Sequence, residues 1–328
     1  MVMALFAGSI LVSFMVLYSA SYAFLILRKW DLRSGSELQL NLERKTYLIS
    51  TLLAYAFGFQ LLSLFLYVFT ADQIHTFFVG AMCAAGSLYA NEFGYPTLIV
   101  KLVNFLLAGL WLVLNYVDNR GYDYPLIKTK SSFLLLLVPL ILLETFLQGN
   151  YFLRLNPNII TSCCGTLFST DTFVLPSELT FFQSIPAKAT FYLTLLLTVG
   201  VGAFYFHKGT GAYVFSGLSA LSFVVSVIAI FSFISPYIYE LPTHHCPFCV
   251  LQREYGYIGF FLYATLLFAT VLGLSVGVLM PFRKTKSLAE ILPSFQRTLA
   301  ISSSSLFLVF TAIVTVRILF SNLILEGY

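Results

Sequence analysis

The chain alternates between long apolar runs and short polar connections. Eight runs are long enough to cross a membrane, since a spanning helix needs about 20 mostly apolar residues. They cover about 3–27, 47–70, 96–116, 131–149, 188–207, 212–235, 252–280 and 298–322. The first run lacks a basic leader and a cleavage site, so we expect it to be retained as a helix. The pattern predicts an all-α integral membrane protein with eight transmembrane helices.

Composition excludes several alternatives to this fold. Of 328 residues, 59% are hydrophobic and 10% are charged, whereas soluble domains carry roughly 25% charged residues. A chain with so few charged residues cannot cover its surface with groups that face water. Lipid must therefore be its solvent. The net charge of +4 is weak evidence for nucleic acid, because most basic residues lie in short loops. We therefore expect membrane lipids as partners and no nucleic acid.

Basic residues are divided unevenly between two alternating sets of loops. One set holds 13 of the 18 Lys and Arg residues, and the positive-inside rule assigns it to the cytoplasm. Its members are Arg28, Lys29, Arg33, Arg44, Lys45, Arg120, Lys128, Lys130, Lys208, Arg283, Lys284, Lys286 and Arg297. The other set holds little more than Arg154, Lys188 and Arg253. The bias predicts a protein of the cytoplasmic (inner) membrane with both termini on the extracytoplasmic side.

All five cysteines fall in the three loops assigned to the extracytoplasmic face. Cys83 lies in loop 71–95, Cys163 and Cys164 in loop 150–187, and Cys246 and Cys249 in loop 236–251. Cysteines used as apolar fillers would lie mostly inside helices. Their gathering on the oxidising side indicates either redox chemistry or structural disulfides.

A weak internal repeat suggests two parallel halves. Residues 1–149 form a four-span N-terminal half and residues 188–328 a four-span C-terminal half, joined by the loop 150–187 with its vicinal cysteines. In each half a cysteine-bearing loop connects the second and third spans. Residues 83–86 and 92–95 match 246–249 and 254–257 at four positions. Parallel repeats are one way to build membrane proteins.

The strongest local motif is the Cys-x-x-Cys formed by Cys246 and Cys249. We expect it at the first turn of the seventh span, where helix-start amides stabilise a thiolate and lower the cysteine pKa. Pro247 suits a first helical position, and a protonated His245 would favour the Cys246 thiolate further. A pair in this setting is redox-active more often than structural.

This motif, followed by Gln252 and Arg253, resembles that of the DsbB family of membrane disulfide-generating enzymes, and more distantly the vitamin K epoxide reductases. The resemblance covers about ten residues and the helix behind them. It implies that Cys246 and Cys249 are a quinone-coupled pair and that Arg253 is the quinone-site cation, with Gln252 and His245 as further cofactor contacts.

The chain departs from that family in two ways. DsbB-type proteins have four spans, whereas this chain has eight predicted spans. Their second redox pair follows the motif, whereas Cys83, Cys163 and Cys164 precede it. A four-helix unit in permuted order, built from spans four to seven, would reconcile the two arrangements.

We predict that Cys163 and Cys164 do not form a disulfide with each other. Adjacent Cα atoms lie about 3.8 Å apart, whereas a disulfide usually needs about 4.4–6.8 Å. Each sulfur is therefore expected to have a different partner, and Cys83 could be one.

The predicted function is a membrane thiol–disulfide oxidoreductase. An extracytoplasmic thiol protein would be oxidised through Cys163 or Cys164, with or without Cys83, and electrons would pass through the Cys-x-x-Cys to quinone.

Two other functions remain open from the sequence. His244, His245, Cys246 and Cys249, with His75 nearby, could bind copper or zinc, because thiolate and imidazole ligands select soft ions. The chain could instead be a structural or electron-transfer subunit of a respiratory membrane complex.

Three ionisable residues fall inside predicted spans, near their outer ends. They are Lys101, Glu144 and Arg317. Such residues are functional candidates by default. Because they lie within reach of the interface, we expect snorkelling or mutual pairing and assign them no catalytic role.

Overall fold

The structure is a computed structural model that describes residues 1–31, 36–156, 158, 160–161 and 184–325. These residues form helices and connecting loops, with one isolated parallel β-bridge between Val79 and Ile160. Eight helices are long and apolar enough to span a membrane. The predicted all-α membrane fold is therefore confirmed, and the sidedness of the loops stays a prediction.

The main helices follow the apolar runs closely. They are α1 (Val2–Lys29), α2 (Glu37–Gln73), α4 (Gly94–Asp118), α5 (Ile127–Leu153), α7 (Ser184–Lys208), α8 (Ala212–Ala229), α10 (Ile258–Val278) and α11 (Ile291–Leu319). The largest difference is in α2, whose 37 residues correspond to about 55 Å at 1.5 Å per residue. It begins ten residues before the predicted span, because the polar stretch 37–46 continues the helix beyond its apolar part.

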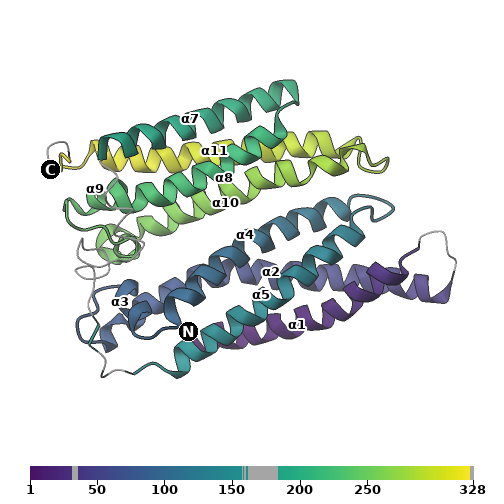
Figure 1. The fold of residues 1–328 in the computed structure, drawn as a ribbon, viewed down its shortest axis with the longest axis horizontal. Helices are drawn as coiled ribbons and strands as arrows, with labels where there is room; N and C mark the ends of the chain where they lie inside the picture. Colours follow the sequence, from purple (N-terminus) through teal and green to yellow (C-terminus); the bar gives the residue numbers. More distant parts are fainter. Residues whose placement is uncertain (32–35, 157, 159, 162–183, 326–328) are drawn as a thin grey trace. The chain divides into compact units, whose positions relative to one another are not determined.

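The chain divides into two compact units. Unit 1 comprises Met1–Thr70, Asn91–Leu155 and Pro281–Ser294. Unit 2 comprises Ala71–Ala90, Asn156–Met280 and Phe295–Tyr328. Each unit therefore contains four of the main helices, drawn in Figure 1, and the segment that carries Cys83 belongs to unit 2.

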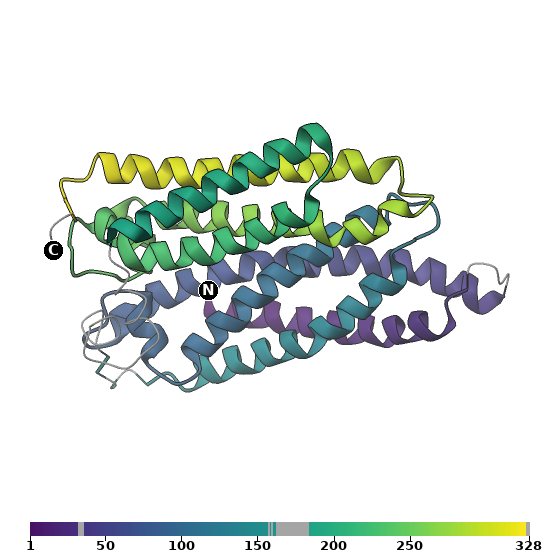
Figure 2. The same cartoon turned by 45° about the horizontal axis from the view of Figure 1, so that its top comes forward.

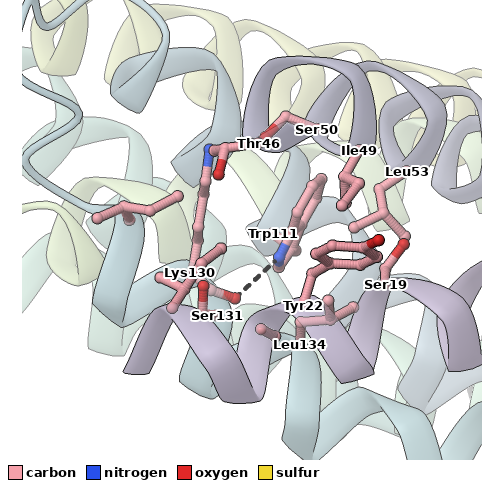
Figure 3. A pocket seen from close by; sticks show the side chains of 13 residues that line it. Ser19, Tyr22, Thr46, Ile49, Ser50, Leu53, Trp111, Lys130, Ser131 and Leu134 are labelled. Atoms are coloured by element: carbon pink, nitrogen blue, oxygen red, sulfur yellow. Dashed lines mark hydrogen bonds between the residues drawn. The ribbon is translucent and has the colours of Figure 1, made fainter. Parts of the chain in front are cut away.

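Unit 1 is built from α1, α2, α4 and α5. Helix α5 packs along both α1 and α4. The apolar core joins residues of all four helices, including Val16, Phe57, Trp111 and Leu137, and the rings of Phe57 and Trp111 meet edge to face at 4.9 Å. Near one end the core leaves a cavity of about 20 Å³, shown in Figure 3, which is room for one water molecule.

Two buried ion pairs lie within the helices of unit 1. Lys101 Nζ of α4 is 2.5 Å from Glu144 Oε1 of α5, and both side chains are almost completely inaccessible. Glu144 also accepts hydrogen bonds from the amides of Gln60 and Asn104. The expected mutual pairing of Lys101 and Glu144 is thus confirmed.

The second pair joins Lys130 Nζ of α5 to Asp118 Oδ2 of α4 at 2.5 Å. Lys130 also donates to Ser50 Oγ and to Asn115 Oδ1. The prediction that Lys130 lies in a loop between spans was therefore wrong. The helix begins at Ile127, before this residue, and its cation is buried against a carboxylate.

Unit 2 has a core made mainly of apolar and hydroxyl side chains. Helix α8 packs against α7 and α10, and Figures 1 and 2 show these helices side by side. Phe191, Phe233, Leu266 and Phe310 are among the buried core residues. Helix α8 ends in a π-helical turn, Ile230–Ile234, which leads into the short α9 (Ser235–Tyr239).

Candidate functional site

Three of the five cysteines converge inside unit 2. Cys83, Cys246 and Cys249 are 0%, 0% and 5% exposed, and their sulfur atoms all lie within 4.8 Å of one another. The Sγ atoms of Cys83 and Cys246 are 3.6 Å apart, which is van der Waals contact and well beyond the roughly 2.05 Å of a disulfide bond. Cys163 and Cys164 lie outside the described residues.

The prediction that the Cys-x-x-Cys occupies the first turn of a spanning helix is wrong. Cys249 opens a 3₁₀ turn of three residues, Cys249–Leu251, and the spanning helix α10 begins only at Ile258. Gly256 and Tyr257 have φ values of +65° and +54°, so a continuous right-handed helix cannot pass through them. The amides at the start of α10 are therefore too far along the chain to stabilise the cysteine thiolates in the way expected.

Two tyrosine hydroxyls hold the backbone of the motif instead. Tyr239 at the end of α9 donates to the carbonyl of Cys246 at 2.6 Å and accepts the N–H of Val250 at 2.7 Å. Tyr263 of α10 donates to the carbonyl of Pro247 at 2.5 Å. These hydrogen bonds fix the loop of the motif against the helices, although its regular structure is limited to one 3₁₀ turn.

Aromatic rings and the two histidines surround the motif. The ring of Tyr239 lies edge to face with His244 at 4.5 Å and with Tyr255 at 4.8 Å. Burial lowers the pKa of His244, an effect opposed by the negative charge of Cys83 and reinforced by His245. Burial raises the pKa of Tyr255, and the negative charges of Cys249 and Glu254 raise it further.

The sulfur cluster differs from the metal-ligand set expected from the sequence. Cys246 and Cys249 belong to it, but Cys83 takes the place expected for His244 and His245. The Nδ1 atom of His245 instead contacts the carbonyl of Phe231 at 2.8 Å. His75, in the 3₁₀ turn Ile74–Phe77, bonds the carbonyl of Asp72.

Arg253 and Gln252, two of the three residues expected at a quinone, lie in different settings. Arg253 is exposed on the 3₁₀ turn Arg253–Tyr255, just before α10. Its guanidinium group fits a quinone carbonyl, to which it can donate hydrogen bonds. The Gln252 amide is already engaged, because its Nε2 donates to the carbonyl of Met82 at 2.7 Å and lies 3.4 Å from Asp72 Oδ1. Arg253 therefore fits the cofactor better than Gln252 does.

The segment that leads to Cys163 and Cys164 lies beside the one that leads to Cys83. Thr161 N–H donates to the carbonyl of Val79 at 3.0 Å. At Gly80, φ is +89° and an added Cβ would lie 2.2 Å from the carbonyl oxygen of Thr161, so this crossing requires glycine.

Sequence reasoning missed Asp72, Tyr239 and Tyr263. Asp72 is buried and its Oδ1 accepts the backbone N–H of Ala84. The two tyrosines are part of a total of 20 in the chain, and no local pattern distinguishes them from residues of an interfacial aromatic belt. Only the approach of distant segments gives these side chains a role.

No protein-family model, curated protein or solved structure matches this chain.

Proposed function

We propose that the protein is a membrane thiol–disulfide oxidoreductase that passes electrons from extracytoplasmic thiols to quinone. The observation that carries the proposal is the contact of Cys83 with the Cys-x-x-Cys, with Sγ atoms 3.6 Å apart in a buried cluster. Thiol–disulfide exchange requires one sulfur to reach another, and a third cysteine beside a Cys-x-x-Cys supplies the attacking or the receiving sulfur.

In the proposed sequence the Cys246–Cys249 disulfide is the oxidised form of the centre. The Cys83 thiolate attacks the sulfur of Cys246, the new bond joins Cys83 to Cys246, and Cys249 leaves as a thiolate that takes a proton. A dithiol partner protein then reduces the centre through Cys163 or Cys164, losing two electrons and two protons as its own disulfide forms. The bond between Thr161 and Val79 supports this order, because it brings the chain that enters Cys163 beside the chain that enters Cys83.

A quinone supplies the two-electron acceptor that regenerates the Cys246–Cys249 disulfide. Among the residues described, Arg253 would hold its carbonyl, since its guanidinium group is exposed immediately before α10. This part of the proposal depends on the family resemblance of the motif together with that placement.

The experiment uses the full-length protein in membrane vesicles with a dithiol substrate and a soluble quinone. Quinone reduction is followed by absorbance, and thiol loss is followed in the same sample. We expect Cys246→Ser and Cys249→Ser each to reduce both signals to background, because the Cys246–Cys249 disulfide that exchanges with quinone can no longer form. Arg253→Gln should slow quinone reduction while the Cys246–Cys249 bond still forms.

The matched control is Glu254→Gln, which changes the next exposed residue and should leave both rates unchanged. Full activity in either Cys-to-Ser protein would eliminate this mechanism.

A second candidate is a soft-metal site, and the same sulfur cluster favours it. Three buried cysteine sulfurs within 4.8 Å can converge on one ion, and thiolates select Cu(I) or Zn. Metal analysis of the purified protein separates the two functions. Stoichiometric copper or zinc that is lost in Cys83→Ser, Cys246→Ser and Cys249→Ser alike would favour the metal site, whereas metal-free active protein would exclude it.

A further inference from the structure

The two cysteine segments of unit 2 are joined by a side-chain amide as well as by sulfur contact. Cys83 and Cys246 are 163 positions apart in the chain. Gln252, three residues after Cys249, donates from Nε2 to the carbonyl of Met82 at 2.7 Å. Met82 directly precedes Cys83, so this bond fixes the backbone on the N-terminal side of that cysteine.

The other side of Cys83 is reached through Asp72. Its Oδ1 accepts the backbone N–H of Ala84, the residue after Cys83, at 3.2 Å, and the same oxygen lies 3.4 Å from Gln252 Nε2. Asp72 is 6% exposed, so water competes little for these contacts. The Gln252 amide therefore contacts the backbone before Cys83 directly and the backbone after it by way of one carboxylate oxygen.

We propose that Gln252 and Asp72 are positioning residues that hold Cys83 against Cys246. The inference rests on the proposed thiol–disulfide function and adds residues to it. In the step concerned, the Cys83 thiolate bonds to the Cys246 sulfur, the Cys246–Cys249 bond breaks, and Cys249 receives the electron pair and a proton. No net electron leaves the three cysteines in this step.

The physical reason is proximity. Exchange between two sulfurs depends on how often they meet, and a fixed contact raises the rate far above that of freely moving groups. The contact between the two sulfurs at 3.6 Å is itself weak, because a thiol is a weak hydrogen-bond donor and acceptor. Hydrogen bonds to the residues on either side of Cys83 are what restrain its Sγ atom.

The test follows formation of the Cys83–Cys246 bond in full-length protein carrying Cys249→Ser. This background removes the competing sulfur, and a diazene thiol oxidant drives the reaction. Peptide mapping without reduction identifies the bond and separates it from any bond to Cys163 or Cys164. Gln252→Met has nearly the same length without the amide, and we expect bond formation to slow by about tenfold or more.

Gln73→Met is the matched control, since it makes the same replacement at an exposed residue beside Asp72. Its rate should stay within about twofold of the parent, as for most surface changes. At position 72, Asp72→Asn keeps an oxygen that can accept the Ala84 N–H, whereas Asp72→Leu removes it. We expect Asn to restore the rate that Leu loses, which a general defect in folding would not produce.

Bond formation at the parent rate in both Gln252→Met and Asp72→Leu would overturn the positioning role, and so would a parent protein that forms no Cys83–Cys246 bond. If Gln252→Met fails to fold, the Asn and Leu variants of Asp72 decide the question. Failure of the proposed function gives a different result. In that case the parent bonds quickly and the variants slowly, but protein with all five cysteines oxidises no thiol with quinone.

Discussion

The two units place their polar chemistry in opposite ways. Unit 1 buries two ion pairs among its helices, Lys101 with Glu144 and Lys130 with Asp118. Unit 2 gathers three cysteine sulfurs in loops at the end of its helices. Intramembrane charges are the default functional candidates in a membrane protein, yet each of these four charges has its ion partner and at least one further hydrogen bond.

The difference separates polar groups that are satisfied from polar groups that can react. The carboxylate of Glu144 accepts from Lys101, Gln60 and Asn104, so its charge is balanced and hydrogen-bonded. The three sulfurs lie within 4.8 Å of one another and no disulfide joins them, so a two-electron oxidant could link a pair of them. The charges of unit 1 therefore serve stability, and the proposed reactivity is placed at the sulfurs of unit 2.

The largest expected effect comes from breaking the buried pair in unit 1. Glu144→Leu leaves Lys101 charged and unpaired and removes the acceptor of two amides. Stability should fall by about 3–5 kcal/mol, as for other buried pairs that lose one partner. Thermal unfolding in detergent, followed by the helical circular dichroism signal, measures the change. Lys101→Met combined with Glu144→Leu should recover most of the loss, because no uncompensated charge then remains.

The control is the exposed pair of Arg154 and Glu92, whose N and O atoms are 3.8 Å apart. Glu92→Leu should cost less than about 1 kcal/mol. If the folded double variant at positions 101 and 144 lost thiol-oxidising activity, the division of roles between the two units would be wrong.

An intermediate effect is expected from two glycines, one in each unit. Gly80→Ala should destabilise the protein by more than about 1 kcal/mol, because φ is +89° and the Thr161 carbonyl leaves no room for a Cβ. Gly58 lies in α2 with no heavy atom near an added Cβ, so Gly58→Ala should stabilise its helix by roughly 0.5–1 kcal/mol. Unfolding midpoints of the two variants, measured side by side, should therefore move in opposite directions. Equal shifts would mean that the crossing at Gly80 is not a constraint.

The smallest effect concerns pH and His244. Because burial lowers the pKa of His244, the folded protein binds a proton there less readily than the unfolded chain does. Its contribution to stability is therefore complete above the unfolded value of about 6.5 and declines as the pH falls below it. Replacing the residue by His244→Gln should flatten the pH dependence of the unfolding midpoint between about pH 7.5 and 5.5. An unchanged slope would show that other groups cause the acid sensitivity.

The helices were predictable because eight separated apolar runs have few alternative structures in lipid. The start of α10 was not, since the predicted span began at Gln252. Gly256 was the available signal, because glycine commonly occupies the left-handed position at which a helical turn stops. Tyr257 also adopts the left-handed backbone conformation, which is unusual for a bulky residue, and nothing in the sequence signalled it.

The sulfur cluster could be predicted only in part. The placement of Cys83, Cys246 and Cys249 in connections between spanning helices was readable from the apolar runs, but the pairing of segments was not. The sequence left open a pairing of Cys83 with Cys163 or Cys164, and the structure brings Cys83 to Cys246. Contacts between residues 163 positions apart depend on how the helices pack in three dimensions. The sequence around Gln252 does not indicate that its side chain takes part in such a contact.

The π-helical turn at the end of α8 has a consequence for the tautomer of His245. Phe231, within this turn, presents its carbonyl oxygen to Nδ1 of His245 at 2.8 Å. A carbonyl can only accept, so Nδ1 must carry the hydrogen. In the neutral ring the lone pair therefore resides on Nε2, and this tautomer is fixed by a change of helix type in another segment. The neutral residue next to Cys246 thus presents Nε2 as its hydrogen-bond acceptor.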